Sequence, residues 1–140
     1  MPNPNNSVLA LDVGERRIGV AIASLVAKLP RPLTTIENDG KVLQQLEKLV
    51  KDNEAGLLVI GLPRGLNGQE TAQTAKVRQF ASGLSDSLGI PVVLQDEALT
   101  SRQAEAELQL RGISNRDKAA IDSLAATYIL EDYLRIEAKA

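Results

Sequence analysis

Residues 8–23 read VLALDVGERRIGVAIA, which is two apolar runs separated by a short polar turn. The first run, residues 8–11, ends directly at Asp12, and the second covers residues 18–23. Apolar runs this close together, with Gly14 in the turn between them, are typical of a β-hairpin. We therefore predict two antiparallel strands at the start of the chain, with the Asp12 carboxylate at the end of the first strand.

Beyond this hairpin, short apolar runs alternate with apolar residues at helical spacing. The patterns predict strands over residues 33–36, 57–60 and 92–94, and helices over residues 39–53 and 77–88. Pro30 and Pro32 favour an edge position for the first of these strands, because proline removes a ladder hydrogen bond. Gly89 and Pro91 mark the end of the second helix.

Two more helices are predicted near the end of the chain by capping-box spacing: Thr100 with Gln103, and Ser114 with Asp117. The first of them stops near Gly112, and the last carries a stripe of Ile121, Leu124, Ala125 and Tyr128. This order predicts one α/β domain over residues 1–140, after a frayed lead-in at residues 1–6. Its mixed five-stranded sheet has three antiparallel and then two parallel strands, flanked by helices.

The composition excludes several kinds of chemistry. The 140 residues contain no Cys and no His, so a Cys/His zinc site and a Ser–His or Cys–His nucleophile pair are impossible. Carboxylates remain, and they suit hard cations such as Mg²⁺ or Mn²⁺. One Phe and two Tyr are too few to stack the bases of a single strand. The formal net charge of −2 counts against a phosphate-binding surface.

The sequence carries no pattern of membrane insertion or export. No stretch approaches the ~18 apolar residues that a spanning helix needs. Residues 1–7 are polar and lack the basic-then-apolar pattern of a signal peptide. We therefore expect a cytoplasmic protein with no membrane partner.

A few acidic residues stand out because of where they fall. Asp12 ends one predicted strand, Asp96 and Glu97 end another, and Asp122 lies between apolar positions of the last helix. Sites in open α/β sheets form at the carboxyl ends of strands, where a buried carboxylate needs a cation or hydrogen bonds. Plainer interpretations stay open: a turn residue for Asp12, a solvated loop for Asp96 and Glu97, and a pair with Lys118 for Asp122.

Residues 61–68, GLPRGLNG, form a glycine-rich connection between a predicted strand and a predicted helix. Such loops let backbone N–H groups approach an anion. The spacing does not match the phosphate-binding pattern of nucleotide hydrolases, since no Lys-Ser/Thr follows Gly68. An anion site and a plain connection both remain open.

Four motifs, in order, resemble those of the YqgF family of pre-16S ribosomal RNA nucleases and Holliday-junction-resolvase-like proteins. The first comprises residues 11–14 and 17–21, and the second comprises residues 59–63 with Gly68, Gln73 and Val77. The third is Asp96-Glu97 with Leu99-Thr100, and the fourth comprises Lys118, Ile121-Asp122, Ala125-Ala126 and Ile129-Leu130. Each motif alone is loose, but four in order from residue 8 to about residue 132 are specific.

This resemblance implies a ribonuclease-H-like fold and a nuclease with three acids at one Mg²⁺ or Mn²⁺ centre. Carried over by position, the catalytic residues and metal ligands are Asp12, Glu97 and Asp122. Two such cations about 4 Å apart clamp the attacking and leaving oxygens of a phosphodiester. The implied reaction is phosphodiester hydrolysis in processing the 5′ end of pre-16S rRNA, a step of ribosome biogenesis. Its implied partner is structured RNA in a pre-ribosomal particle.

Basic residues near the same sheet edge are candidates for contacts with substrate phosphates. They are Arg17, Arg64, Arg16 and Arg102. Arg102 is included because the third family motif commonly continues with Arg, where this chain has Ala98, and Arg102 follows one helical turn later. Arg16 also suits a plain solvated position.

Three other functions stay open on the sequence. A Holliday-junction-type resolvase would use the same acids on branched DNA, where symmetric cutting favours a dimer. A non-catalytic RNA- or ribosome-binding module fits the negative net charge and Ala98. A nucleotide-binding ATPase or sugar-kinase-like protein shares an Asp-x-Gly after its first strand, but 140 residues leave no room for an enclosing second domain.

Overall fold

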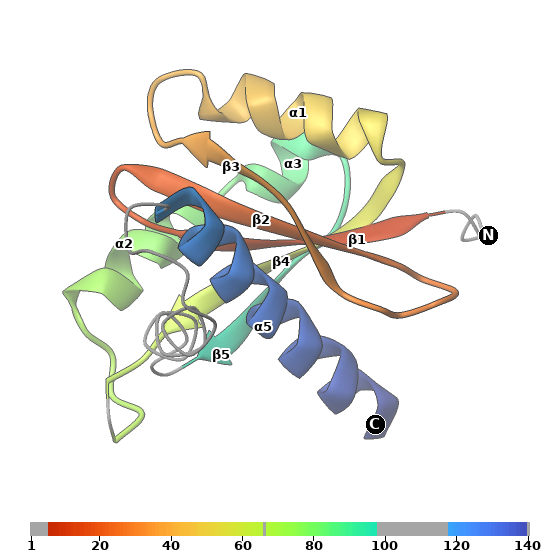
Figure 1. Ribbon diagram of the computed structural model, residues 1–140. Coiled ribbons are helices and arrows are strands. Elements are labelled where there is room, and N and C mark those ends of the chain that lie inside the picture. The colour runs from red at the N-terminus through yellow and green to blue at the C-terminus, as the bar shows by residue number, and fades with distance from the viewer. Residues whose placement is uncertain (1–5, 66, 98–117, 140) are drawn as a thin grey trace.

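The computed structural model describes residues 6–65, 67–97 and 118–139 (Figure 1). Its strands are β1 (Ser7–Val13), β2 (Arg17–Ser24), β3 (Arg31–Glu37), β4 (Ala55–Pro63) and β5 (Val92–Glu97). They form one five-stranded sheet in the order β3-β2-β1-β4-β5. β2 runs antiparallel to both β1 and β3, whereas β4 runs parallel to both β1 and β5. The predicted mixed sheet is confirmed, as is the edge position of the third strand.

The described helices cover both faces of this sheet. They are α1 (Val42–Asp52), α2 (Ala72–Ala81), α3 (Leu84–Leu88) and α5 (Lys118–Lys139). Alternate residues of β1 point to opposite faces. Leu9 and Leu11 pack in the cluster that contains α1, α2 and α3, and Val8 and Ala10 pack against α5. Figure 1 shows α5 lying across one face, with α1 and α3 on the other side.

The single helix predicted over residues 77–88 is wrong. The chain forms α2 and α3 instead, with Ser82 and Gly83 between them. Gly83 has φ +77, a left-handed conformation that ends one helix and redirects the chain into the next. The apolar spacing runs through this break, because both helices pack on the same face, so periodicity alone misses it. Gly89, at φ +72, does end α3 as predicted.

Several sequence predictions lie outside the described residues. They concern the helix expected from Thr100 to Gly112, the Ser114 cap, and the positions of Ala98 and Arg102. Within the described part of the chain, no helix is long and apolar enough to cross a membrane.

Candidate active site

Asp12 lies on the central strand and on the face that α5 covers. It pairs with Gly19 of β2 in the antiparallel register, and paired residues point to the same face. The side chain is half-buried. Burial, and then the negative charge of Asp122, raise the pKa of the Asp12 carboxyl from 3.8 to about 6. Asp12 and Asp122 therefore lie close enough for their charges to interact.

Gly19 explains why these two acids meet. A Cβ at this position would lie 1.9 Å from the backbone oxygen of Asp122, so only glycine lets α5 rest on β2 here. The Thr35 hydroxyl on β3 also donates a hydrogen bond of 2.7 Å to the Ala119 carbonyl, which ties the start of α5 to the sheet. Because Gly19 is the partner of Asp12 in the sheet, the contact that seats the helix also brings Asp122 beside Asp12.

Arg17 pairs with Asp122 in this structure. Its Nε donates to Asp122 Oδ2 at 2.7 Å, and the two side chains are 32% and 22% exposed. The sequence suggested Lys118 as the partner of Asp122, but the described contact is with an arginine 105 residues away along the chain. It also suggested Arg17 as a phosphate contact, and the pairing with Asp122 was missed because no local pattern reports it.

Glu97 is the last residue of β5 and lies at the end of the sheet where β1 also ends, which is the end that carries Asp12. It is level with Pro63 of β4, and Val93 of the same strand packs in the α5 cluster. Alternation along β5 therefore directs Glu97 to the face that carries Asp12. Two strand spacings separate β5 from β1, which is about 10 Å across the sheet. Among residues 6–65, 67–97 and 118–139, no group of three Asp, Glu, His or Cys side chains is close enough to hold a metal ion.

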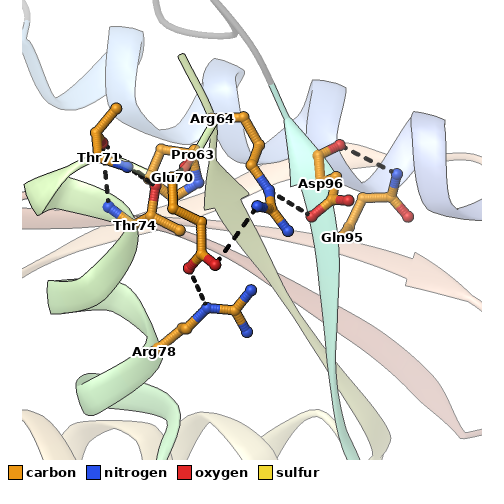
Figure 2. A network of polar contacts seen from close by, with 8 residues as sticks. All are labelled: Pro63, Arg64, Glu70, Thr71, Thr74, Arg78, Gln95 and Asp96. Atoms are coloured by element: carbon orange, nitrogen blue, oxygen red, sulfur yellow. Dashed lines mark hydrogen bonds and ion pairs between the residues drawn. The ribbon is translucent and has the colours of Figure 1, made fainter. Parts of the chain in front are cut away.

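Asp96 takes part in a different network (Figure 2). Its Oδ1 accepts from Arg64 Nε at 3.2 Å, and Arg64 Nη1 lies 3.9 Å from Glu70 Oε2. Arg78 of α2 donates to Glu70 Oε1 at 2.7 Å. Asp96 is level with Leu62, which packs on the opposite face from α5. Neighbouring acids of one motif thus point to opposite faces, and only Glu97 shares the face of Asp12.

Hydrogen bonds within the glycine-rich loop between β4 and α2, and between this segment and α2, hold the connection in place. Gly65 N–H donates to the Gln69 carbonyl, and Gly68 N–H donates to the Gly65 carbonyl, both at 2.9 Å. The buried Thr74 hydroxyl donates to the Pro63 carbonyl, and Thr71 caps α2 together with Thr74. These N–H groups already have acceptors in the loop, which favours the plain connection. The Thr-x-x-Thr spacing is the signal that could have located the cap.

Three more arginines were predicted to contact substrate phosphates: Arg16, Arg64 and Arg102. Arg16 is exposed beside Arg17, and its carbonyl accepts from the Asn38 N–H at 2.8 Å. The Arg64 side chain is 21% exposed and is tied to Asp96 and Glu70. Arg102 lies outside the described residues.

Residues 6–136 match the RuvX family model, described as Holliday junction resolvase. The chain belongs to the RuvX family. Among its relatives is a Crocosphaera subtropica protein named "Putative pre-16S rRNA nuclease", 45% identical over 131 residues, which are 91% of this chain and 92% of the relative. A Methylobacillus flagellatus protein of the same name is 41% identical over 140 residues, covering 95% and 96%. The resemblance to the YqgF nucleases is thereby confirmed.

A solved structure shows that this RuvX-family chain has the predicted fold. It is Thermus thermophilus RuvC in complex with a Holliday junction substrate, with a TM-score of 0.58 at 16% identity. The match covers 94% of this chain and 96% of that one. The ribonuclease-H-like fold is therefore confirmed.

Proposed function

We propose that this chain is a metal-dependent nuclease that hydrolyses phosphodiester bonds in the cytoplasm, and that its substrate is the 5′ region of pre-16S rRNA. The observation that carries the proposal is the placement of Asp12 and Asp122 side by side across Gly19. Relatives more than 40% identical over almost the whole chain carry the name of a pre-16S rRNA nuclease, which supports the choice of substrate.

The residues at this edge fit a hard divalent cation. With no His or Cys in the chain, the donors are carboxylate oxygens, which Mg²⁺ and Mn²⁺ prefer. Burial and the neighbouring Asp122 charge both disfavour ionised Asp12, and a bound cation offsets that cost. Asp12 and Asp122 would hold the cation. Glu97, the third predicted ligand, points to the same face, but it is not close enough to them in the described structure to complete a group of three acids. A bound cation of this kind polarises a phosphoryl oxygen and lowers the pKa of a water molecule.

Residues of the chain position the metal ligands and offer positive charges to the substrate. Asp12 is fixed on the central strand, so the oxygen ligands hold their places without a reorganisation of the backbone. Arg17 lies at the same end of the sheet as Asp12 and supplies a guanidinium group that recognises phosphate oxygens in pairs, whereas Arg64 is held by Asp96 and Glu70. Arg16 is exposed next to Arg17 and offers a second positive charge to the substrate backbone.

A second candidate function is resolution of four-way DNA junctions. The family description favours it, and so does the shared fold with a RuvC protein seen on a Holliday junction. Both functions use the same acids and differ in the substrate. A non-catalytic binding module is the third candidate, and retention of Asp12, Glu97 and Asp122 in one family pattern argues against it.

The test compares cleavage of labelled pre-16S-type RNA and of a four-way DNA junction, with Mg²⁺ and with Mn²⁺. The variants are Asp12→Asn and Asp122→Asn. The matched control is Asp132→Asn, which removes one carboxylate from α5 ten residues beyond Asp122, about 15 Å along the helix axis. We expect wild type and Asp132→Asn to cleave, and the first two variants to match the reaction without enzyme.

The outcome also separates the candidate functions. A preference for RNA supports the proposed substrate, and a preference for the junction supports the resolvase. Cleavage by Asp12→Asn at the wild-type rate would remove Asp12 from the mechanism. Binding of RNA with neither cleavage nor metal binding would establish the non-catalytic module instead.

A further inference from the structure

The ion pair between Arg17 and Asp122 lies inside the proposed metal site. Arg17 is the first residue of β2, and Asp122 is on the first turns of α5, where the helix backbone rests on Gly19. The 2.7 Å contact between Arg17 Nε and Asp122 Oδ2 occupies one oxygen of a carboxylate whose negative charge also acts on Asp12. Both side chains are less than one-third exposed, so water screens this pair less than a surface pair.

A guanidinium and a metal cation compete for the same oxygen. Asp12 and Asp122 are two carboxylates close enough for their charges to interact, and Arg17 supplies one positive charge to Asp122 in the described structure. A lone pair of Asp122 Oδ2 that accepts from Arg17 is not free to ligate a cation. Resting on the metal site proposed above, we infer that Arg17 takes the place of the divalent cation at Asp122 in the metal-free protein and competes with it for that carboxylate.

This competition gives Arg17 a role that acts through Asp122, as a positioning residue. When the cation binds, the guanidinium leaves Asp122 and becomes available to another anion. A substrate phosphodiester is an anion that a guanidinium binds well, with two parallel hydrogen bonds. Substrate that captures Arg17 therefore strengthens cation binding, and by linkage the cation strengthens substrate binding equally.

The test measures the affinity of the full chain for Mn²⁺ alone, by calorimetry after removal of metal with a chelator. Arg17→Gln removes the competitor. Arg16→Gln is the matched control, because it removes the same charge from the adjacent exposed position and so reports the general electrostatic effect. We expect Arg17→Gln to bind Mn²⁺ about fivefold more tightly than Arg16→Gln, the change expected for a half-buried charged hydrogen bond.

A second readout follows thermal unfolding in chelator and in Mn²⁺. Without metal, Arg17→Gln should unfold at a lower temperature than Arg16→Gln, because the two carboxylates repel each other without compensation. Mn²⁺ should raise its midpoint more than it raises that of wild type. Arg17→Lys keeps the charge but loses the planar fork. Its Mn²⁺ affinity should fall between those of wild type and Arg17→Gln. This variant still tests the inference if Arg17→Gln does not fold.

The outcomes distinguish this inference from the proposed function. If wild type binds Mn²⁺ and Arg17→Gln binds it no more tightly than Arg16→Gln does, competition is refuted and the metal site stands. Weaker binding by Arg17→Gln also refutes competition, since Arg17 would then support the cation. If wild type and both Arg17 variants bind no Mn²⁺, the metal site itself is wrong and the inference fails with it.

Discussion

Replacement of Gly19 by alanine tests how the two acids are brought together. Gly19 is the partner of Asp12 in the sheet, and the backbone of α5 lies directly on it at Asp122. The three heavy atoms nearest to a methyl group placed here are all backbone atoms of Asp122 and Ser123, so it enters the space between strand and helix. The substitution therefore perturbs the distance between the acids and leaves their chemistry unchanged.

The required displacement follows from the contacts of the added Cβ. It would lie 1.9 Å from the Asp122 carbonyl oxygen and 2.8 Å from the Ser123 nitrogen, whereas real Cβ contacts are not shorter than 3.0 Å. The helix backbone must therefore move away by about 1.1 Å, because backbone atoms cannot rotate aside as a side chain does. Crowding of this kind costs about 1–3 kcal/mol of stability. A misplacement of about 1 Å in a catalytic site costs about 100-fold in rate.

Urea unfolding and nuclease cleavage measure these two effects. Gly40→Ala is the control for stability, because a Cβ there meets nothing within 4 Å. Gly61→Ala is a second control, which distinguishes the effect of crowding from the effect of displacing Asp122. Its Cβ would meet the Cδ1 end of the Ile129 side chain, which can rotate, so it should lose stability with a smaller loss of cleavage. If Gly19→Ala matches Gly40→Ala in both measurements, the proposed role of the helix contact is refuted.

Two further results are expected from urea unfolding. In metal-free buffer, Asp12→Asn should stabilise the fold at pH 7 by about 3 kcal/mol, because the pKa of about 6 is raised above 3.8 and the folded state disfavours the ionised carboxyl. The gain should shrink as the pH falls from about 6 to 4, where Asp12 becomes neutral in both states, and a gain independent of pH would contradict this cause. Thr74→Val should destabilise the fold by about 1–2 kcal/mol, since the Pro63 carbonyl loses its donor; an unchanged free energy of unfolding would show that water replaces the hydroxyl.

Much of the fold could be predicted from local sequence pattern. The apolar runs of the hairpin and of residues 57–60 and 92–94 lie within β1, β2, β4 and β5, because a buried strand needs a continuous apolar stretch whatever its neighbours are. Strand boundaries were less accurate: β4 extends to Pro63, beyond the predicted end at residue 60. Sheet pairing continues into the glycine-containing segment, and periodicity does not report pairing.

The candidate site shows the same division between local and tertiary information. Asp12 and Glu97 could be selected because each ends a strand, and Asp122 because it interrupts an apolar stripe. The difference between Asp96 and Glu97 could not be predicted, since the register with β4 decides which of them faces α5. The partner of Arg64 is likewise set by strand neighbours from distant parts of the sequence.

By itself, the sequence determined the order of the elements, the absence of His and Cys chemistry, and the positions of the acids along the strands. These properties depend on composition and on periodicity over a few residues. Only the tertiary structure decided that Asp122 lies close enough to Asp12 for their charges to interact and that Asp122 is paired with Arg17. Both contacts depend on how closely α5 packs on β2, and that distance is set by the missing side chain of Gly19, more than 100 residues from the helix residue it admits.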